Sequence, residues 1–106
     1  MLLNIRKPGD TVTLKMSSGE ELIGTYKSED ATSYVIDRPV SLSVGPKGGP
    51  ALTPYLMTVN PQNARDLAFN KSLVVCVANT EKELATQYSS AMSGIVAAPA
   101  GLRLDA

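Results

Sequence analysis

The sequence predicts a mainly β domain: a small, strongly bent, five-stranded barrel that is followed by a C-terminal helix. Three observations predict this class. Apolar and polar residues alternate with a period of two in residues 12–37, and two tight turns interrupt this stretch. The run Leu73–Ala78 is apolar at every position, which is typical of a buried strand. After Thr80, apolar residues recur at helical spacing, so a helix should end the domain.

The first two strands are expected on either side of a turn at Ser17–Gly19. Serine side chains bond nearby backbone groups, and glycine adopts positive φ readily, so these residues suit a hairpin turn. Gly24 lies inside the second strand, where a glycine marks a bend or a close approach of two backbones. The strand before the turn carries its apolar residues on one face: Val12, Leu14 and Met16.

A turn at residues 29–32 leads into one long third strand at 34–44. Four even positions of this strand are apolar and should share the core face: Ile36, Val40, Leu42 and Val44. Arg38 and Pro39 interrupt the alternation, and we expect them to perturb the strand there.

This stretch resembles the first sequence motif of the Sm and Sm-like proteins, which form small SH3-like barrels. The motif has a turn glycine, a second glycine five positions on, an apolar residue, an acidic residue and then two base-contacting residues. The family usually carries a bulky residue and then asparagine at those last two places, and this chain departs from that pattern. The matching positions are Gly19, Gly24, Tyr26, Asp30, and finally Ser33 and Tyr34.

Beyond the third strand, residues 45–54 predict an exposed loop because they hold three glycines and three prolines. A fourth strand is expected at 54–60, where apolar residues alternate. Residues 61–70 would then be an insertion, since Sm-like proteins pass from strand four to strand five through a very short loop. The resemblance implies that Asn70 and Lys71 take the place of the Arg-Gly pair with which that loop contacts RNA.

The apolar run 73–78 predicts a fifth strand that is covered on both faces, by the core and by either the helix or a neighbouring subunit. Cys76 within it should be a small core residue. In Sm-like proteins this strand pairs with strand four of the next subunit. The resemblance therefore implies a homo-oligomeric ring, assembled through strands four and five.

The C-terminal helix should begin at a T-x-x-E capping box that is formed by Thr80 and Glu83. Pro99 and Gly101 should stop it. The apolar stripe on this helix is expected to pack against the barrel or a neighbour: Leu84, Tyr88, Met92 (or Ala91) and Ile95.

The length of 106 residues predicts a single domain over residues 1–106. Its parts are a barrel at about 10–79, a helix at about 80–96 and a loose tail at 97–106. No stretch approaches the roughly 18 apolar residues of a membrane span, and the first residues lack the features of a secretory signal. We therefore expect no membrane partner and a cytoplasmic location, in a host cell if the protein is viral.

Charge and residue usage argue against several function classes. Ten basic and ten acidic residues give a net charge of zero, which argues against a broad positive surface for duplex binding. The chain has no histidine, the commonest general base, and no cysteine or acidic cluster replaces it as a metal ligand set. We therefore expect that the protein is not an enzyme, that it has no catalytic residue and that it binds no metal or cofactor.

Three candidate site residues each have two interpretations. Asp30 could orient a base-binding loop or bond the amides of its own turn. Tyr34 could stack on a nucleobase or, because its parity matches that of Ile36, pack into the core. Lys71 could contact a phosphate or be solvated.

Two functional hypotheses follow. The first is an Sm-like homo-oligomeric ring that binds single-stranded RNA, or DNA, and serves nucleic-acid processing. The second is a protein–protein scaffold or virion-assembly module with the same barrel and no nucleic-acid role. The resemblance, with its departures from the motif, implies a divergent member of the family, of phage or environmental origin. The candidate RNA-binding residues are Asp30, Ser33, Tyr34, Asn70 and Lys71.

Overall fold

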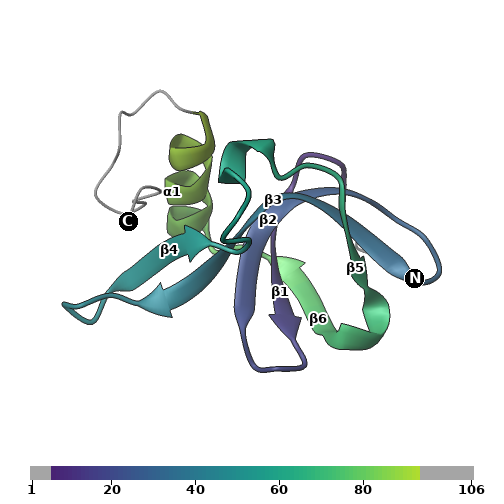
Figure 1. Cartoon of the computed structure of the whole chain (residues 1–106), viewed down its shortest axis with the longest axis horizontal. Helices are drawn as coiled ribbons and strands as arrows, with labels where there is room; N and C mark the ends of the chain where they lie inside the picture. Colours follow the sequence, from purple (N-terminus) through teal and green to yellow (C-terminus); the bar gives the residue numbers. More distant parts are fainter. Residues whose placement is uncertain (1–5, 94–106) are drawn as a thin grey trace.

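A computed structural model of the chain describes residues 6–93. Within this range, six antiparallel strands form one open sheet, and a single α-helix follows them (Figure 1). The end of the expected helix, at 94–96, and the expected tail at 97–106 lie outside the described residues. The elements are β1 Thr11–Met16, β2 Glu21–Glu29, β3 Ser33–Val44, β4 Pro50–Pro54, the 3-10 turn η1 Pro61–Asn63, β5 Leu67–Asn70, the 3-10 turn η2 Lys71–Leu73, β6 Val74–Asn79 and α1 Lys82–Ser93.

The strands follow the order β4-β3-β2-β1-β6, and β5 also pairs with β3. The prediction of a mainly β domain with a C-terminal helix is confirmed, but the sheet has six strands rather than five and is not closed. β4 pairs with Val40–Val44 and β5 pairs with Ser33–Ile36, so both lie along the same edge of β3. Residues 55–66 leave the sheet between them, and together β4 and β5 resemble one interrupted strand.

The predicted loop at 45–54 and strand at 54–60 are wrong. Gly45 and Gly49 close a tight turn, with 2.6 Å between the Gly45 amide nitrogen and the Gly49 oxygen, and the chain returns at once as β4. Pro50 and Pro54 end this strand, which is possible because β4 is an edge strand and its outer side needs no donors. Similarly, the expected insertion at 61–70 contains η1 and all of β5.

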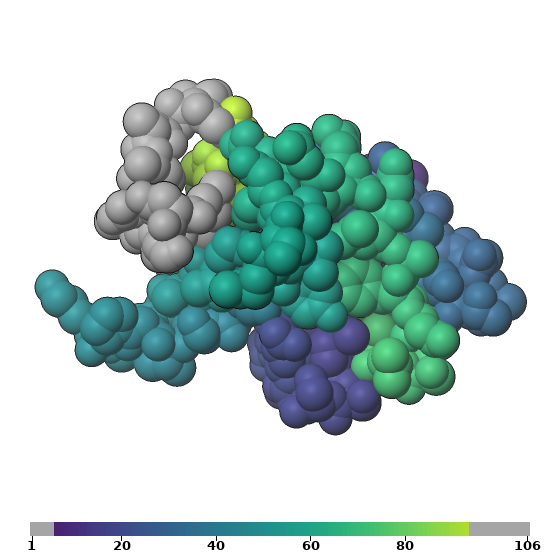
Figure 2. All heavy atoms as spheres, viewed as in Figure 1, coloured from purple at the N-terminus to yellow at the C-terminus, as the bar shows by residue number. Residues whose placement is uncertain are grey.

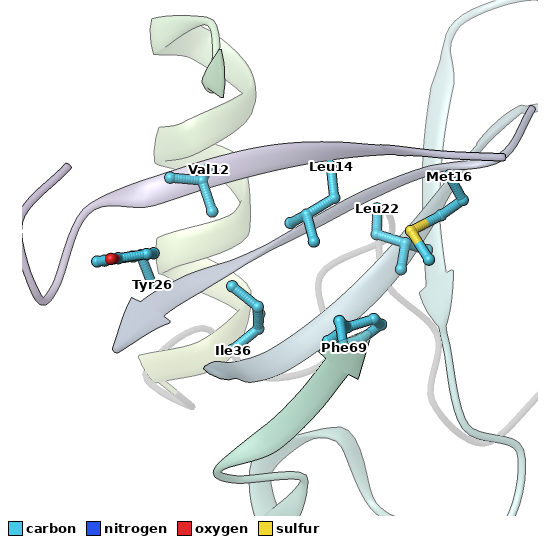
Figure 3. Packing of buried hydrophobic residues seen from close by; sticks show 7 residues of the cluster. All are labelled: Val12, Leu14, Met16, Leu22, Tyr26, Ile36 and Phe69. Carbon is cyan, nitrogen blue, oxygen red and sulfur yellow. The ribbon is translucent and has the colours of Figure 1, made fainter. Parts of the chain in front are cut away.

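The concave side of the sheet holds the larger hydrophobic cluster, whose side chains point toward one another from four strands (Figure 3). The expected shared face of β1 is confirmed, since its three apolar residues are all buried here. Gly24 makes the expected close approach, because a Cβ at this position would meet Ile36 Cγ2 and lie 3.2 Å from the Asp37 oxygen. The cluster comprises Val12, Leu14, Met16, Leu22, Tyr26, Ile36 and Phe69.

A second cluster lies on the opposite face, under α1. Ile23 follows Leu22 in β2 and therefore points to the other side of the sheet. Val40 also belongs to this second cluster, although its parity matches that of Ile36 in the first. Arg38, with φ of 52°, interrupts the strand between them, so the predicted perturbation is confirmed and the predicted single core face of this strand is wrong. The cluster comprises Ile23, Val40, Leu52, Tyr88, Ala91 and Met92.

Helix α1 packs on the sheet through the predicted stripe, with Tyr88 and Met92 buried and Leu84 half-buried. Its first amides are bonded by Glu81 rather than Thr80: the Glu81 carboxylate accepts from the Glu83 and Leu84 amides, each at 3.2 Å. Thr80 directly follows β6 and is held to β1, because its amide donates to the Thr11 oxygen at 3.1 Å. The predicted capping box is therefore replaced by a Glu81 cap. Among residues 6–93, no helix has the length and apolar character that a membrane span requires.

β6 differs most from the sequence-based expectation. In the single chain, Val75 of β6 is 66% exposed and Leu73, in η2 just before it, is 53% exposed, so no residue of the described range covers the second face of this strand. Cys76 is also exposed, and its predicted role as a core residue is wrong. The physical reason is topological: among the described residues, β6 is the last strand of the open sheet and pairs only with β1, while α1 contacts residues of β2, β3 and β4 instead.

Candidate nucleic-acid interface

Two turns that are far apart in the sequence meet at one end of the sheet. Antiparallel pairing of β3 with β5 places Ser33 opposite Asn70, and the Lys71 amide donates to the Thr32 oxygen at 2.8 Å. The turn between β2 and β3 lies at the opposite end of the molecule from the β3–β4 hairpin (Figure 2). The structure therefore brings all five predicted site residues together in one place: Asp30, Ser33, Tyr34, Asn70 and Lys71.

Asp30 organises the turn between β2 and β3. Its Oδ1 accepts hydrogen bonds from the Thr32 amide at 2.9 Å and from the Ser33 amide at 2.8 Å. These backbone donors, that of Thr32 first, hold the pKa of the Asp30 carboxyl below its usual value. Asp30 thus bonds the amides of its own turn, and in doing so it fixes the loop that presents Ser33 and Tyr34.

Asn70 has a comparable role in the second turn. Its side-chain oxygen accepts a hydrogen bond from the Ser72 amide at 2.9 Å and caps the 3-10 turn η2. Lys71 is the first residue of that turn, so the cap sets where the lysine side chain begins. Each of the two meeting turns is therefore held by a short polar side chain.

Tyr34 lies between the core and the surface. It is half-buried and packs against the larger hydrophobic cluster, as the core interpretation expects. Its ring is also contacted by two cations: the Lys71 Nζ lies 4.8 Å from the ring centroid, and the Arg6 Cζ lies 5.7 Å from it. These distances are within the range of cation–π attraction. The ring is thus both anchored in the fold and part of a charged surface cluster.

Glu29 joins the two cations and was not predicted from the sequence. Its carboxylate accepts from Lys71 Nζ at 2.8 Å, from Arg6 Nη2 at 3.2 Å and from the Tyr26 hydroxyl at 2.8 Å. Donation from Lys71 is the largest cause that lowers the pKa of Glu29 to about 2. Burial, and then the hydrogen bond to Glu29, raise the pKa of Tyr26.

The charges in this cluster balance. Arg6 and Lys71 contribute two positive charges, and Glu29 and Asp30 contribute two negative ones. Lys71 is not freely solvated, since its side chain is only 28% exposed and is ion-paired with Glu29. Glu29 could not be found from sequence spacing, because it meets Arg6 and Lys71 across 23 and 42 residues.

A second charged group lies apart from this cluster and holds the 55–66 segment on the sheet. The carboxylate of Asp37, 2% exposed, accepts from the Asp66 amide at 2.6 Å. Lys27 and Arg65 each place a nitrogen 3.5 Å from its other oxygen. Among the described residues, no group of three His, Cys, Asp or Glu side chains could hold a metal ion.

Comparison of the sequence with protein-family models and with curated proteins found no match. The resemblance to Sm-like proteins therefore rests on the glycine and acid spacing of residues 19–34.

Proposed function

We propose that the chain is an Sm-like module that binds single-stranded RNA or DNA where the β2–β3 turn meets the β5–η2 junction. One observation carries this proposal. The resemblance points to two separate segments of the sequence as nucleotide contacts, and in the fold these two segments share one surface cluster: Ser33 and Tyr34 lie beside Asn70 and Lys71.

Binding at this cluster would combine stacking with charge. A nucleobase that stacks on the exposed part of Tyr34 would contribute roughly 1–3 kcal/mol, because base–aromatic stacking tolerates any base. Lys71 and Arg6 flank the same ring and would contact the phosphate. No covalent chemistry is involved, and the chain acts as a binding module rather than an enzyme.

The proposed module assembles into a homo-oligomeric ring. Within residues 6–93, β6 has an unpaired outer edge and exposed apolar residues, and β4 and β5 form the other edge of the sheet. Beside β5, Tyr55, Leu56 and Leu73 line part of an apolar groove of about 370 Å³. Pairing β6 of one copy with the β4–β5 edge of the next would cover both edges and close the ring.

A second candidate function is a protein–protein scaffold or virion-assembly module that uses the same assembly. The ion pairs of Arg6 and Lys71 with Glu29 favour it, because they leave the candidate interface without net positive charge. The exposed apolar side chains of Leu73 and Val75 favour it as well, since they suit a protein partner.

Fluorescence anisotropy with labelled uridine-rich and adenosine-rich oligonucleotides separates the two functions. On the nucleic-acid proposal, the wild type binds in low salt and the double variant Tyr34→Ala with Lys71→Ala does not. Lys47→Ala is the matched control, since Lys47 lies in the exposed β3–β4 turn at the far end of the molecule. Absence of binding by the wild type at tens of micromolar protein would refute the proposal and favour the scaffold.

A further inference from the structure

The Glu29 carboxylate is held in the way that a bound anion would be. Its Oε1 accepts from Arg6 at 3.2 Å and from the Tyr26 hydroxyl at 2.8 Å, and its Oε2 accepts from Lys71 at 2.8 Å. Three donors from three separate segments thus converge on one negative group. Two of the three are cations, and charge-assisted hydrogen bonds of this kind are the strong ones.

The position of this carboxylate coincides with the place where a phosphate would be needed. The same two cations contact the Tyr34 ring, on which a nucleobase would stack. The phosphate of a nucleotide lies only a few ångströms from its base. A nucleotide stacked on Tyr34 would therefore bring its phosphate to the donors that Glu29 now uses.

Arg6 also has donor capacity that Glu29 does not use. Its Nε is buried and makes no hydrogen bond within residues 6–93. A buried donor without a partner is unfavourable, and a guanidinium can donate through five N–H groups in a planar fork. A phosphate has more acceptor oxygens than a carboxylate and is a good bidentate partner for such a fork.

We infer that Glu29 is an internal competitor for the phosphate of single-stranded nucleic acid, which must displace its carboxylate from Arg6 and Lys71 in order to bind. This inference rests on the proposed function and adds the regulation of that site. It predicts that removing the carboxylate strengthens binding. It also predicts a steeper dependence of binding on salt, because each additional phosphate that Arg6 or Lys71 neutralises releases a counterion from the nucleic acid.

The test compares Glu29→Gln with Glu21→Gln in the full chain. Both variants remove one negative charge from β2, and Glu21 pairs with Lys15 at 3.4 Å. Glu21 is the suitable control because it lies at the opposite end of the strand, about 26 Å away at about 3.3 Å per residue. Glutamine at position 29 keeps an acceptor oxygen for Tyr26 or Lys71, which preserves part of the local hydrogen bonding.

Anisotropy titrations with labelled oligouridine and oligoadenosine, at two salt concentrations, provide the readout. We expect Glu29→Gln to bind about tenfold more tightly than wild type in low salt, and Glu21→Gln to stay within about twofold. The slope of log K against log salt should become steeper by about 0.7 for each additional phosphate that the variant neutralises. Glu29→Thr, which suits a strand end, should change binding in the same direction and serves if the glutamine variant folds poorly.

The outcomes separate the inference from the proposed function. If wild type binds oligonucleotide and Glu29→Gln binds no better than Glu21→Gln, the inference is wrong and the proposed function stands. If Glu29→Gln binds polyglutamate more tightly than wild type does, but binds oligonucleotide no more tightly than wild type does, the Glu29 carboxylate does not compete with phosphate. The inference is then again wrong. If neither wild type nor any variant binds oligonucleotide, the proposed function fails first and the inference fails with it.

Discussion

Replacing Tyr88 with phenylalanine should destabilise the fold measurably, although it removes only one oxygen atom. Tyr88 is 2% exposed in the cluster beneath α1. Its hydroxyl lies 2.9 Å from the Arg38 carbonyl oxygen, 3.2 Å from that of Asp37 and 3.1 Å from the Thr25 Oγ1. It therefore joins the helix to the irregular part of β3, where the strand changes face.

The size of the effect follows from what the substitution leaves behind. The phenylalanine ring fills the same space, so no cavity forms and the apolar contacts with Ile23 and Val40 are kept. The carbonyl oxygens of Asp37 and Arg38 lose a buried donor, and a buried polar group without its partner costs about 1–3 kcal/mol. We expect a loss of about 2 kcal/mol in the free energy of unfolding.

Urea denaturation followed by circular dichroism measures this loss. A domain of this size has an m-value of about 1–1.5 kcal/mol/M, so the midpoint should fall by about 1.5 M. Tyr55→Phe is the matched control, because Tyr55 packs against Phe69 at 5.6 Å between ring centroids and its hydroxyl makes no hydrogen bond within the described range. The control should change stability by less than about 0.5 kcal/mol.

The same substitution has a pH signature. Burial raises the pKa of Tyr88 above 10.0, so its contribution to stability is present below pH 10 and is lost as the pH rises above that value. The stability difference between wild type and Tyr88→Phe should therefore narrow in alkaline solution. If the variant matches wild type within about 0.5 kcal/mol at neutral pH, the proposed connection between α1 and β3 is refuted.

Three further predictions concern other parts of the chain. Gly24→Ala should cost about 1–3 kcal/mol in urea denaturation, because its Cβ would meet Ile36, and a neutral result would contradict the close approach. Lys71 lowers the pKa of Glu29 to about 2, so the stability that this ion pair contributes is present above pH 4.5 and is lost as the pH falls toward 2. In thermal melting at a series of pH values, Glu29→Gln should therefore lack this loss of stability between pH 4.5 and pH 2. Val75→Lys should reduce the molar mass measured by light scattering from that of a ring to that of a monomer, without lowering the stability of the monomer. A wild type that is already monomeric would contradict the proposed ring.

Local patterns predicted the parts of the fold in which neighbouring residues decide the structure. The alternation around Leu14 predicted β1, and Gly24 predicted a close approach that the structure contains. The helix stripe was also correct at Tyr88 and Met92. Each of these depends on side-chain period or backbone freedom within one element, which sequence displays directly.

Other features depend on which strand lies at an edge, and the sequence does not display that. Pro50 and Pro54 argued against a strand, yet an edge strand tolerates them on its outer side. The apolar residues of β6 predicted burial, but Val75 is exposed because β6 is the last strand of the sheet. The five candidate site residues do meet, whereas the role of Glu29 depends on long-range pairing with Arg6 and Lys71 that the sequence does not display.

The central claim is that the β2–β3 turn and the β5–η2 junction form a single-stranded nucleic-acid site. Amide NMR spectra of isotope-labelled protein, recorded during titration with oligouridine, test it most directly. The proposal predicts that the largest shift changes fall on Ser33, Tyr34, Asn70 and Lys71, and that they saturate together. Saturable changes confined to the β6 edge, or none in low salt, would contradict it.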